Sequence, residues 1–240
     1  MPVFRLHDDD ADFPAPYLAQ ADGLLAIGGD LSPLRLFTAY RNGIFPWFEE
    51  QGELFWFSPD PRAVLLPDEL KVHKSMRSLL NKGRFRITCD EAFHRVMQAC
   101  AHTPRQGQEG TWISPAFFEG YMRFHLLGLA HSVEVWEGDN LVGGLYGIAL
   151  GKIFYGESMF SHQDNASKAG FITLVRALKE KGFQLIDCQQ ETPHLLSLGA
   201  RNISRVDFME HLARNVYEPD LRGKWSLDEN GQLHCAAYHQ

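Results

Sequence analysis

The sequence has no long apolar run and few cysteines, and these two absences argue against whole classes of protein. No stretch of its 240 residues approaches the ~20 apolar residues of a membrane span, and the N-terminus has no apolar segment of signal length. The four cysteines form no CxxC pair and have no metal-ligand spacing, so we expect reduced thiols. These features predict a cytoplasmic protein with no membrane partner.

Three catalytic motifs are also missing. The sequence contains no G-x-x-x-x-G-K-[ST] loop for nucleotide phosphates and no HExxH or His/Cys cluster for a metal ion. The segment Gly156-Glu157-Ser158 begins like a nucleophile elbow, but Phe160 stands where the second glycine is needed. We therefore expect no NTPase, no metal site and no covalent serine enzyme.

Hydrophobic residues make up 45% of the chain, enough for a sizeable core, and the net charge is -7. That charge alone disfavours nucleic-acid binding, but screening makes local clusters matter more than the total. One cluster is strongly basic, with no acidic residue between positions 71 and 88. Its cations are Lys71, Lys74, Arg77, Lys82, Arg84 and Arg86. They form either a solvated helix face or a surface for the phosphate backbone of a nucleic acid.

The order of expected elements indicates an α+β or mixed α/β fold. We place a domain boundary in a proline-rich turn, which gives a small N-terminal domain of residues 1–60 and a larger domain of residues 61–240. The larger domain shows a β-β-β-α-β run with flanking helices. Strands are expected at 63–66, 85–88, 130–136, 141–149, 152–159 and 183–189, and helices at 33–43, 73–82, 90–102, 114–128, 165–181 and 204–215. Four of these helices have an expected N-cap: Ser32 and Ser114, each followed by proline, and Asp90 and Asn165.

Three polar groups fall at strand ends beside apolar residues. Glu157 belongs to one strand, and Asp187 and Gln189 belong to another, where residues two apart share a face. Each could be an inert, solvated strand end. Together they favour a small-molecule or acyl-group site. A Gln amide is a poor base but can orient an amine, so such a site suits aminolysis of an ester better than hydrolysis.

Aromatic residues offer a second set of candidates. Trp47 is expected in a proline-bent loop and Trp112 just before a helix, and each could be partly buried core or a platform for base stacking. The helix starting at Asn165 carries an apolar stripe that includes Phe171 and Leu174. Most of that stripe is expected to be core, but its N-terminal end near Ala169 could line a pocket beside Glu157.

Nine segments, in this order, resemble the leucyl/phenylalanyl-tRNA–protein transferase family and together cover about residues 23–200. They are GLLAIGGDLSP (23–33), YRNGIFPWF (40–48), WFSPDPR (56–62), GTWI (110–113), AHSVEVW (130–136), VGGLYG (142–147), GESMFS (156–161), NASK (165–168) and LIDCQ (185–189). Each segment alone is a weak signal, but the ordered set is specific. Residues after 216 match little, and we assign them no role.

This resemblance implies a small N-terminal domain followed by a domain with the fold of GCN5-related N-acetyltransferases. It implies transfer of Leu or Phe, and also Met, from aminoacyl-tRNA to the α-amine of a protein that begins with Arg or Lys. The product would be marked for degradation. Because the aminoacyl ester is already activated, no ATP, acyl-CoA, metal or other cofactor is expected.

The resemblance also assigns roles to residues. Asp187 and Gln189, with Glu157, match catalytic positions. We expect the pair to position the amine, because Gln is a poor base. Substrate-binding positions are Trp47 and Trp112 for the terminal adenosine, and Leu145, Phe154, Gly156, Glu157, Ala169, Phe171, Leu174 and Ile186 for the acyl side chain. Positions on the tRNA-facing side are Tyr40, Lys74, Arg77, Lys82 and Arg84.

Three other functions remain open from the sequence. An acyl-CoA-dependent acetyltransferase would need a [QR]xxGx[GA] loop before a helix, and residues 20–25 come nearest but fail at the last position. A non-catalytic tRNA-binding or degradation adaptor would have no need for carboxylates beside an apolar pocket. An aminoacyltransferase of the peptidoglycan-bridge type would use the same donor with a cell-wall lysine as acceptor.

Overall fold

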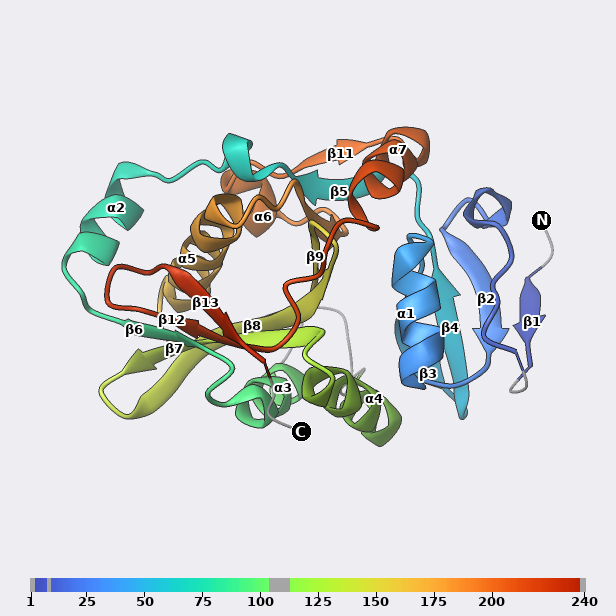
Figure 1. Ribbon diagram of the computed structural model, residues 1–240, viewed down its shortest axis with the longest axis horizontal. Helices are drawn as coiled ribbons and strands as arrows, with labels where there is room; N and C mark the ends of the chain where they lie inside the picture. Colours follow the sequence, from blue (N-terminus) through green and yellow to red (C-terminus); the bar gives the residue numbers. More distant parts are fainter. Residues whose placement is uncertain (1–2, 8–9, 104–112, 238–240) are drawn as a thin grey trace.

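The computed structural model describes residues 3–7, 10–103 and 113–237 and contains two main β-sheets (Figure 1). The smaller sheet belongs to the N-terminal part and has the order β1-β2-β4-β3. Its strands are β1 (Phe4–Leu6), β2 (Leu24–Gly28), β3 (Phe45–Glu50) and β4 (Glu53–Phe57), and α1 (Pro33–Arg41) packs beside it.

Aromatic packing explains this small sheet and corrects one expectation. Trp47 lies within β3 and not in a loop, and its ring meets that of Phe57 on β4 edge-on at 4.7 Å. Phe45, on the same strand, is only 1% exposed. Dense aromatics beside Gly and Pro had suggested an irregular segment, but alternate rings cover both faces of a strand and stabilise it by burial.

The larger sheet has seven strands in the order β11-β5-β10-β9-β8-β7-β6. Their bounds are β5 (Arg62–Leu65), β6 (Arg86–Cys89), β7 (Ala130–Glu137), β8 (Asn140–Leu150), β9 (Ile153–Ser161), β10 (Leu185–Gln189) and β11 (Arg201–Ile203). All neighbouring pairs are antiparallel except β9 and β10, which are parallel and joined through α5 (Ala166–Glu180). This confirms the expected β-β-β-α-β run and the α+β class.

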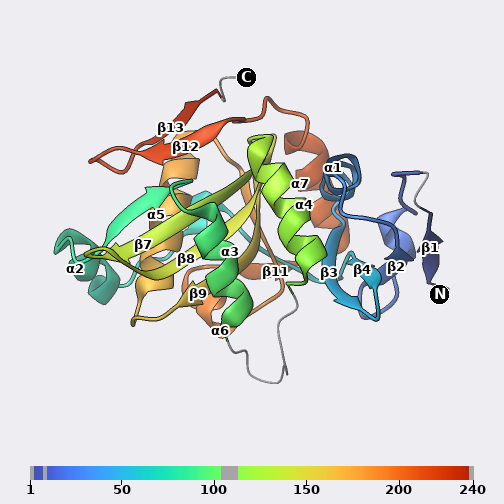
Figure 2. The ribbon, with the colours of Figure 1, turned by 90° about the horizontal axis from the view of Figure 1, so that it is seen from below.

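Helices cover both faces of this sheet (Figures 1 and 2). A Cβ on Gly143 of β8 would strike Ala166 of α5, whereas one on Gly144 would approach Val96 of α3 (Phe93–His102). Adjacent strand residues point to opposite faces, so α5 and α3 lie on opposite sides. The other helices are α2 (Lys74–Asn81), α4 (Pro115–Leu126), α6 (Pro193–Ser197) and α7 (Arg205–Asn215).

Helix starts follow the cap-plus-proline pattern where serine supplies the cap. Ser32 and Ser114 each accept a hydrogen bond from the backbone N–H three residues later. Two expected caps are wrong. Asn165 precedes α5 in a left-handed conformation without a side-chain cap, and Asp90 does not cap α3, which starts after Ala92.

Asp90 has a different partner, in the C-terminal segment to which we assign no role from the sequence. A hairpin of β12 (Lys224–Leu227) and β13 (Leu233–Ala236) packs near β6. The buried Asp90 carboxylate accepts hydrogen bonds from the backbone N–H of Trp225 and of Ser132. The Trp225 ring stacks on His131 with centroids 3.6 Å apart. These buried contacts of Asp90 and Trp225 therefore anchor the C-terminal hairpin to the larger sheet.

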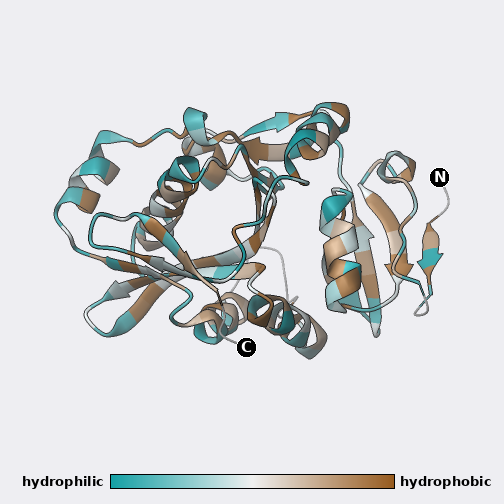
Figure 3. Ribbon diagram, in the orientation of Figure 1, coloured by the Kyte–Doolittle hydropathy of each residue, from teal (hydrophilic) through white to brown (hydrophobic). Residues whose placement is uncertain are grey.

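Hydropathy along the ribbon agrees with this layering, with apolar segments on the strands and on the inner helix faces (Figure 3). Over the residues that the structure describes, no helix combines the length and the apolarity that crossing a bilayer requires.

Candidate active site

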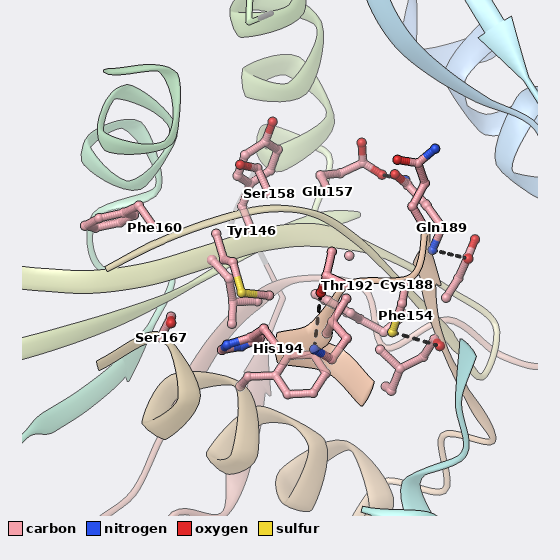
Figure 4. Close-up of a pocket in the computed structure, with 18 of the residues that line it drawn as sticks. Tyr146, Phe154, Glu157, Ser158, Phe160, Ser167, Cys188, Gln189, Thr192 and His194 are labelled. Carbon is pink, nitrogen blue, oxygen red and sulfur yellow. Dashed lines mark hydrogen bonds between the residues drawn. The ribbon is translucent and has the colours of Figure 1, made fainter. Parts of the chain in front are cut away.

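A cavity of about 540 Å³ opens where β8, β9 and β10 meet α5, α6 and the N-terminal strand β3. Figure 4 shows the side chains that surround it. The parallel pairing of β9 with β10 places the polar ends of both strands at the same edge of the sheet. The site is thus built by the crossover that the sequence predicts.

Most of the cavity wall is apolar, and it includes four of the expected pocket residues. Leu145, Phe154, Phe171 and Ile186 all line it, with Gly156 beside them. The wall also contains apolar or weakly polar residues that sequence reasoning missed, among them Met159, Cys188 and Leu195. A largely apolar wall of this size suits an uncharged aliphatic or aromatic group.

Two expected pocket residues are placed elsewhere. Ala169 and Leu174 are 0% and 1% exposed and belong to the core behind the cavity, not to its lining. Both lie on α5, whose inner face carries more apolar residues than the cavity can contact. Trp47 does line the cavity from β3, so both sheets contribute to it. Trp112 lies outside the described residues.

Glu157 and Gln189 meet at the polar end of the cavity. The Gln189 side-chain amide donates to Glu157 Oε1 at 2.7 Å, and both residues are partly buried and line the cavity. Gln189 has a φ of 60° and sits at a register shift between β10 and β5. The expectation that Asp187 and Gln189 share a strand face is therefore wrong, because the irregularity interrupts the alternation.

Asp187 is fully buried and bound to a partner that the sequence did not indicate. Its two carboxylate oxygens accept from Arg62 Nε at 2.8 Å and Nη2 at 2.6 Å. Arg62 is 1% exposed and lies between the rings of Phe45 and Phe208, each 4.6 Å from the guanidinium carbon. Arg62 stands 125 positions from Asp187 in the sequence. The sequence analysis included it only as part of the family-like segment 56–62 and assigned it no role.

Two tyrosines form the other side of the Glu157 environment. The Tyr121 hydroxyl donates to Glu157 Oε2 at 2.8 Å, and the Tyr40 hydroxyl lies 2.6 Å from that of Tyr121. Both rings are 0% exposed. Tyr40 therefore presents no surface to a tRNA, which corrects its expected direct contact. Its role in this arrangement is within the polar network beneath the cavity.

These surroundings determine the charge state of Glu157. Burial is the largest influence and raises the pKa of its carboxyl to about 7, although hydrogen bonds from Tyr121, Tyr40 and Gln189 oppose the rise. The nearby Asp187 charge raises the pKa further. A carboxyl with this pKa exchanges its proton near neutral pH, as a general base or acid requires.

The far end of the cavity carries His194 on α6, which sequence reasoning also missed. Burial, followed by the charge of Lys168, lowers the pKa of its imidazole. Its Nε2 is buried with no hydrogen-bond partner among the described residues. A neutral imidazole at this position adds polar recognition to an otherwise apolar wall.

The basic segment forms an exposed face on and after α2 (Figure 1), and no residue of α2 lines the cavity. Lys74, Arg77 and Lys82 are exposed, as expected for a surface that contacts phosphates. Arg84 is exposed too but forms an ion pair with Glu137 at 2.8 Å. That pairing reduces the charge that Arg84 offers to a ligand.

Across the described part of the chain, no group of three or more His, Cys, Asp or Glu residues could hold a metal ion. All four cysteines are free thiols. Burial, together with the Asp187 charge, raises the pKa of Cys188 far above its usual range, so its thiol is a poor nucleophile at neutral pH.

Comparison with known proteins identifies the family of this chain. The profile of the leucyl/phenylalanyl-tRNA protein transferase family matches residues 64–213, and the profile of that family's N-terminal domain matches residues 29–60. Two curated relatives carry the name leucyl/phenylalanyl-tRNA–protein transferase. The protein of Anaeromyxobacter dehalogenans (strain 2CP-C) is 51% identical over 231 residues, 96% of this chain and 99% of its own. That of Syntrophobacter fumaroxidans is 54% identical over 218 residues, 91% and 93% of the two chains.

Among solved structures, the chain is similar to a GCN5-related N-acetyltransferase from Anabaena variabilis. The TM-score is 0.40 at 12% identity, over 91% of this chain and 59% of the other. The sequence matches span nearly the whole chain and include every strand that builds the cavity. The chain belongs to the leucyl/phenylalanyl-tRNA protein transferase family and is an aminoacyltransferase.

Proposed function

We propose that this enzyme transfers Leu or Phe, and also Met, from aminoacyl-tRNA to the N-terminal Arg or Lys of acceptor proteins. The observation that carries the proposal is the apolar cavity with Glu157 and Gln189 at its polar end. An apolar wall accepts these three side chains and discriminates among them by only about 1–3 kcal/mol per methylene. The flexible side chain of Met159 and the planar ring of Phe171 both line the cavity, so it suits aliphatic and aromatic groups alike.

The acceptor is bound at the polar end. Glu157 is partly exposed and, when ionised, attracts the cationic N-terminal residue of the acceptor. Gln189 donates to Glu157 through its amide nitrogen, so its amide oxygen is turned away and can accept an N–H of the incoming amine. The new N-terminal Leu or Phe then marks the acceptor for degradation, and the reaction takes place in the cytoplasm.

The donor tRNA is held at two places. Trp47, with Trp112, stacks on the 3′-terminal adenosine, and the basic face around α2 contacts phosphates through Lys74, Arg77 and Lys82, with a smaller part for Arg84. We retain the division into residues 1–60 and 61–240, in which the first part supplies β3 to the cavity.

A transfer assay tests the proposal. The purified protein is mixed with Phe-tRNA and a peptide that begins with Arg, without ATP or CoA, and the peptide mass is read. The expected result is a gain of one phenylalanine residue. A matched peptide that begins with Asp is the control and should gain nothing. No gain on the Arg peptide, with folded protein and intact Phe-tRNA, would contradict the proposal.

A further inference from the structure

The buried position of Asp187 limits what it can do in the reaction. Its side chain is 0% exposed, and its oxygens already accept from Arg62 at two points and from the backbone N–H of Gln189 at 2.9 Å. A carboxylate whose oxygens are occupied in a closed ion pair of this kind does not contact the substrate. Asp187 therefore holds the end of β10 in place and does not act on the amine.

Gln189 is also not a proton acceptor. Its amide nitrogen donates to Glu157 Oε1 at 2.7 Å, and amide oxygens are very weak bases. Its left-handed backbone, at φ 60°, brings the side chain across to Glu157 instead of leaving it beside Asp187. Gln189 can orient the incoming nitrogen, but the proton has to go to another group.

Asp187 and Glu157 both border the cavity, but the Asp187 side chain is 0% exposed, whereas Glu157 is partly exposed. It lines the cavity together with Gly156 and Gln189, and both of its oxygens are fixed, one by Gln189 and the other by Tyr121. On this geometry, and resting on the proposed function, we propose that Glu157 accepts the proton that the acceptor amine loses. In this proposal Tyr121 and Tyr40 are positioning residues that hold its carboxylate.

The proposed step is balanced without any added reagent. The neutral amine nitrogen attacks the ester carbonyl carbon, the C–N bond forms, and Glu157 takes one N–H proton. The C–O bond to the terminal ribose then breaks, and the ribose oxygen leaves with the proton that Glu157 returns. Amine and ester thus become amide and alcohol, and the carboxylate is regenerated.

The groups around Glu157 come from four elements. Tyr121 faces it from α4, Tyr40 from α1, and Asp187 from β10, with the Arg62 guanidinium of β5 beyond Asp187. Burial raises the pKa of Glu157 to about 7, whereas the tyrosine hydrogen bonds lower it. Loss of the Tyr121 hydroxyl must therefore move this pKa upward, because that hydroxyl favours the charged form.

The first test compares two substitutions that each remove one buried hydroxyl. Values of kcat/KM for an Arg-starting peptide are measured from about pH 5.5 to 9 for the wild type, Tyr121→Phe and Tyr155→Phe. Tyr155 is the matched control, because its hydroxyl donates to the backbone oxygen of Tyr40 and not to a carboxylate. The acceptor amine titrates near about 7.7–8.0 in every case, so only the enzyme group can separate the profiles.

The expected result is an acid limb shifted to higher pH, by roughly half a unit or more, in Tyr121→Phe and unshifted in Tyr155→Phe. In Glu157→Gln we expect turnover to fall about 10²–10⁴-fold. The limb of the pH profile that reports Glu157 should vanish, so that only the limb from titration of the acceptor amine remains. The proposal would be overturned if the acid limb of the pH profile lay at the same pH in the wild type, Tyr121→Phe and Tyr155→Phe. It would also be overturned if Glu157→Gln kept the acid limb of the wild type.

One more outcome would overturn it, namely a raised KM for the Arg peptide with kcat unchanged in Glu157→Gln, because Glu157 would then only bind the acceptor. Failure of the wild-type protein to transfer Phe at all overturns the proposed function and this inference together. Transfer with an unmoved limb overturns the inference alone.

Discussion

At the scale of single residues, the Arg62–Asp187 ion pair is the contact on which the site most depends. Both side chains are at most 1% exposed, and Arg62 Nη1 also donates to the backbone oxygen of Gly43 at 3.3 Å. The pair joins β5 to β10 beside Phe45 of the N-terminal sheet. A buried charge left without its partner is costly, so each residue makes the other necessary.

We therefore expect Arg62→Met to lower the free energy of unfolding by about 3–5 kcal/mol, because it leaves the Asp187 carboxylate buried and unpaired. The double variant Arg62→Met with Asp187→Asn should recover a large part of that loss. Urea unfolding of the two single variants, the double variant and the wild type measures this cycle. If the double variant were no more stable than Arg62→Met, the unpaired charge would not be the cause.

At the scale of elements, the glycines of β8 and β9 set the space around the cavity. A Cβ at Gly147 would collide with the backbone oxygen of Tyr155 and with the ring of Phe154. A Cβ at Gly156, which lines the cavity, would meet only the backbone oxygen of Asp187 at 3.6 Å, an ordinary contact. The two glycines thus have different roles, one in strand packing and one in the cavity wall.

Gly147→Ala should accordingly destabilise the fold by about 1–3 kcal/mol or more through overpacking. Gly156→Ala should change stability by less than about 1 kcal/mol but raise KM for the aminoacyl donor, since the added methyl group narrows the cavity. Thermal unfolding and transfer kinetics on the same preparations separate the two effects. Equal destabilisation by both substitutions would contradict these assignments.

The basic face on α2 is the second element whose role can be measured. Substituting Lys74→Ala with Arg77→Ala should weaken tRNA binding and flatten the plot of log affinity against log salt by about 1.4–1.8, as expected for two lost phosphate contacts. The charge-matched control is Arg214→Ala with Lys224→Ala, two exposed cations on α7 and β12. A slope unchanged from wild type in the α2 variant would mean that its face is merely solvated.

The sequence predicted best those elements whose signals are local. Ser32 and Ser114 mark helix starts within three residues, and the alternation of 130–136 and 141–149 marks a hairpin. The strand β3 was missed because its aromatics are stabilised by partners on β4 and not by a local pattern. The hairpin after residue 216 was missed for a related reason, since Trp225 is buried by contacts with His131 and Asp90 far away in sequence.

The candidate site shows the same division. Glu157, Asp187 and Gln189 could be predicted because strand ends on either side of a crossover helix meet at one sheet edge. Their individual environments could not, because Arg62, Tyr40 and Tyr121 come from three other elements. Segments far away in sequence enclose Asp187 in an ion pair with Arg62, whereas they leave Glu157 lining the cavity.

At the scale of the whole molecule, the cavity is formed where the two sheets meet. Burying the Glu157 carboxyl there costs free energy whenever it is charged. Phe45 and Trp47 of the N-terminal sheet line the same cavity as Glu157. Burial is the largest cause of the raised pKa of the Glu157 carboxyl. The proton-accepting role proposed for Glu157 thus uses a group that the folded protein holds unfavourably when it is charged.

This cost predicts how stability depends on pH. The pKa of Glu157 is about 7 in the folded protein against an ordinary 4.5, so the unfolded chain releases this proton first as pH rises. Its contribution to stability is therefore fully present below about pH 4.5 and is lost as pH rises to about 7. Glu157→Gln does not titrate, so it should match the wild type near pH 4 and be more stable by about 1–3 kcal/mol at pH 8.

Urea unfolding of wild type and Glu157→Gln at both pH values measures the difference. Glu119→Gln is the control for the loss of one carboxylate at the surface, because Glu119 is exposed on α4. A Glu157→Gln protein that is less stable than the wild type at pH 8 would show that the carboxylate is held favourably. The raised pKa, and the proton-accepting role that it supports, would then lose their physical basis.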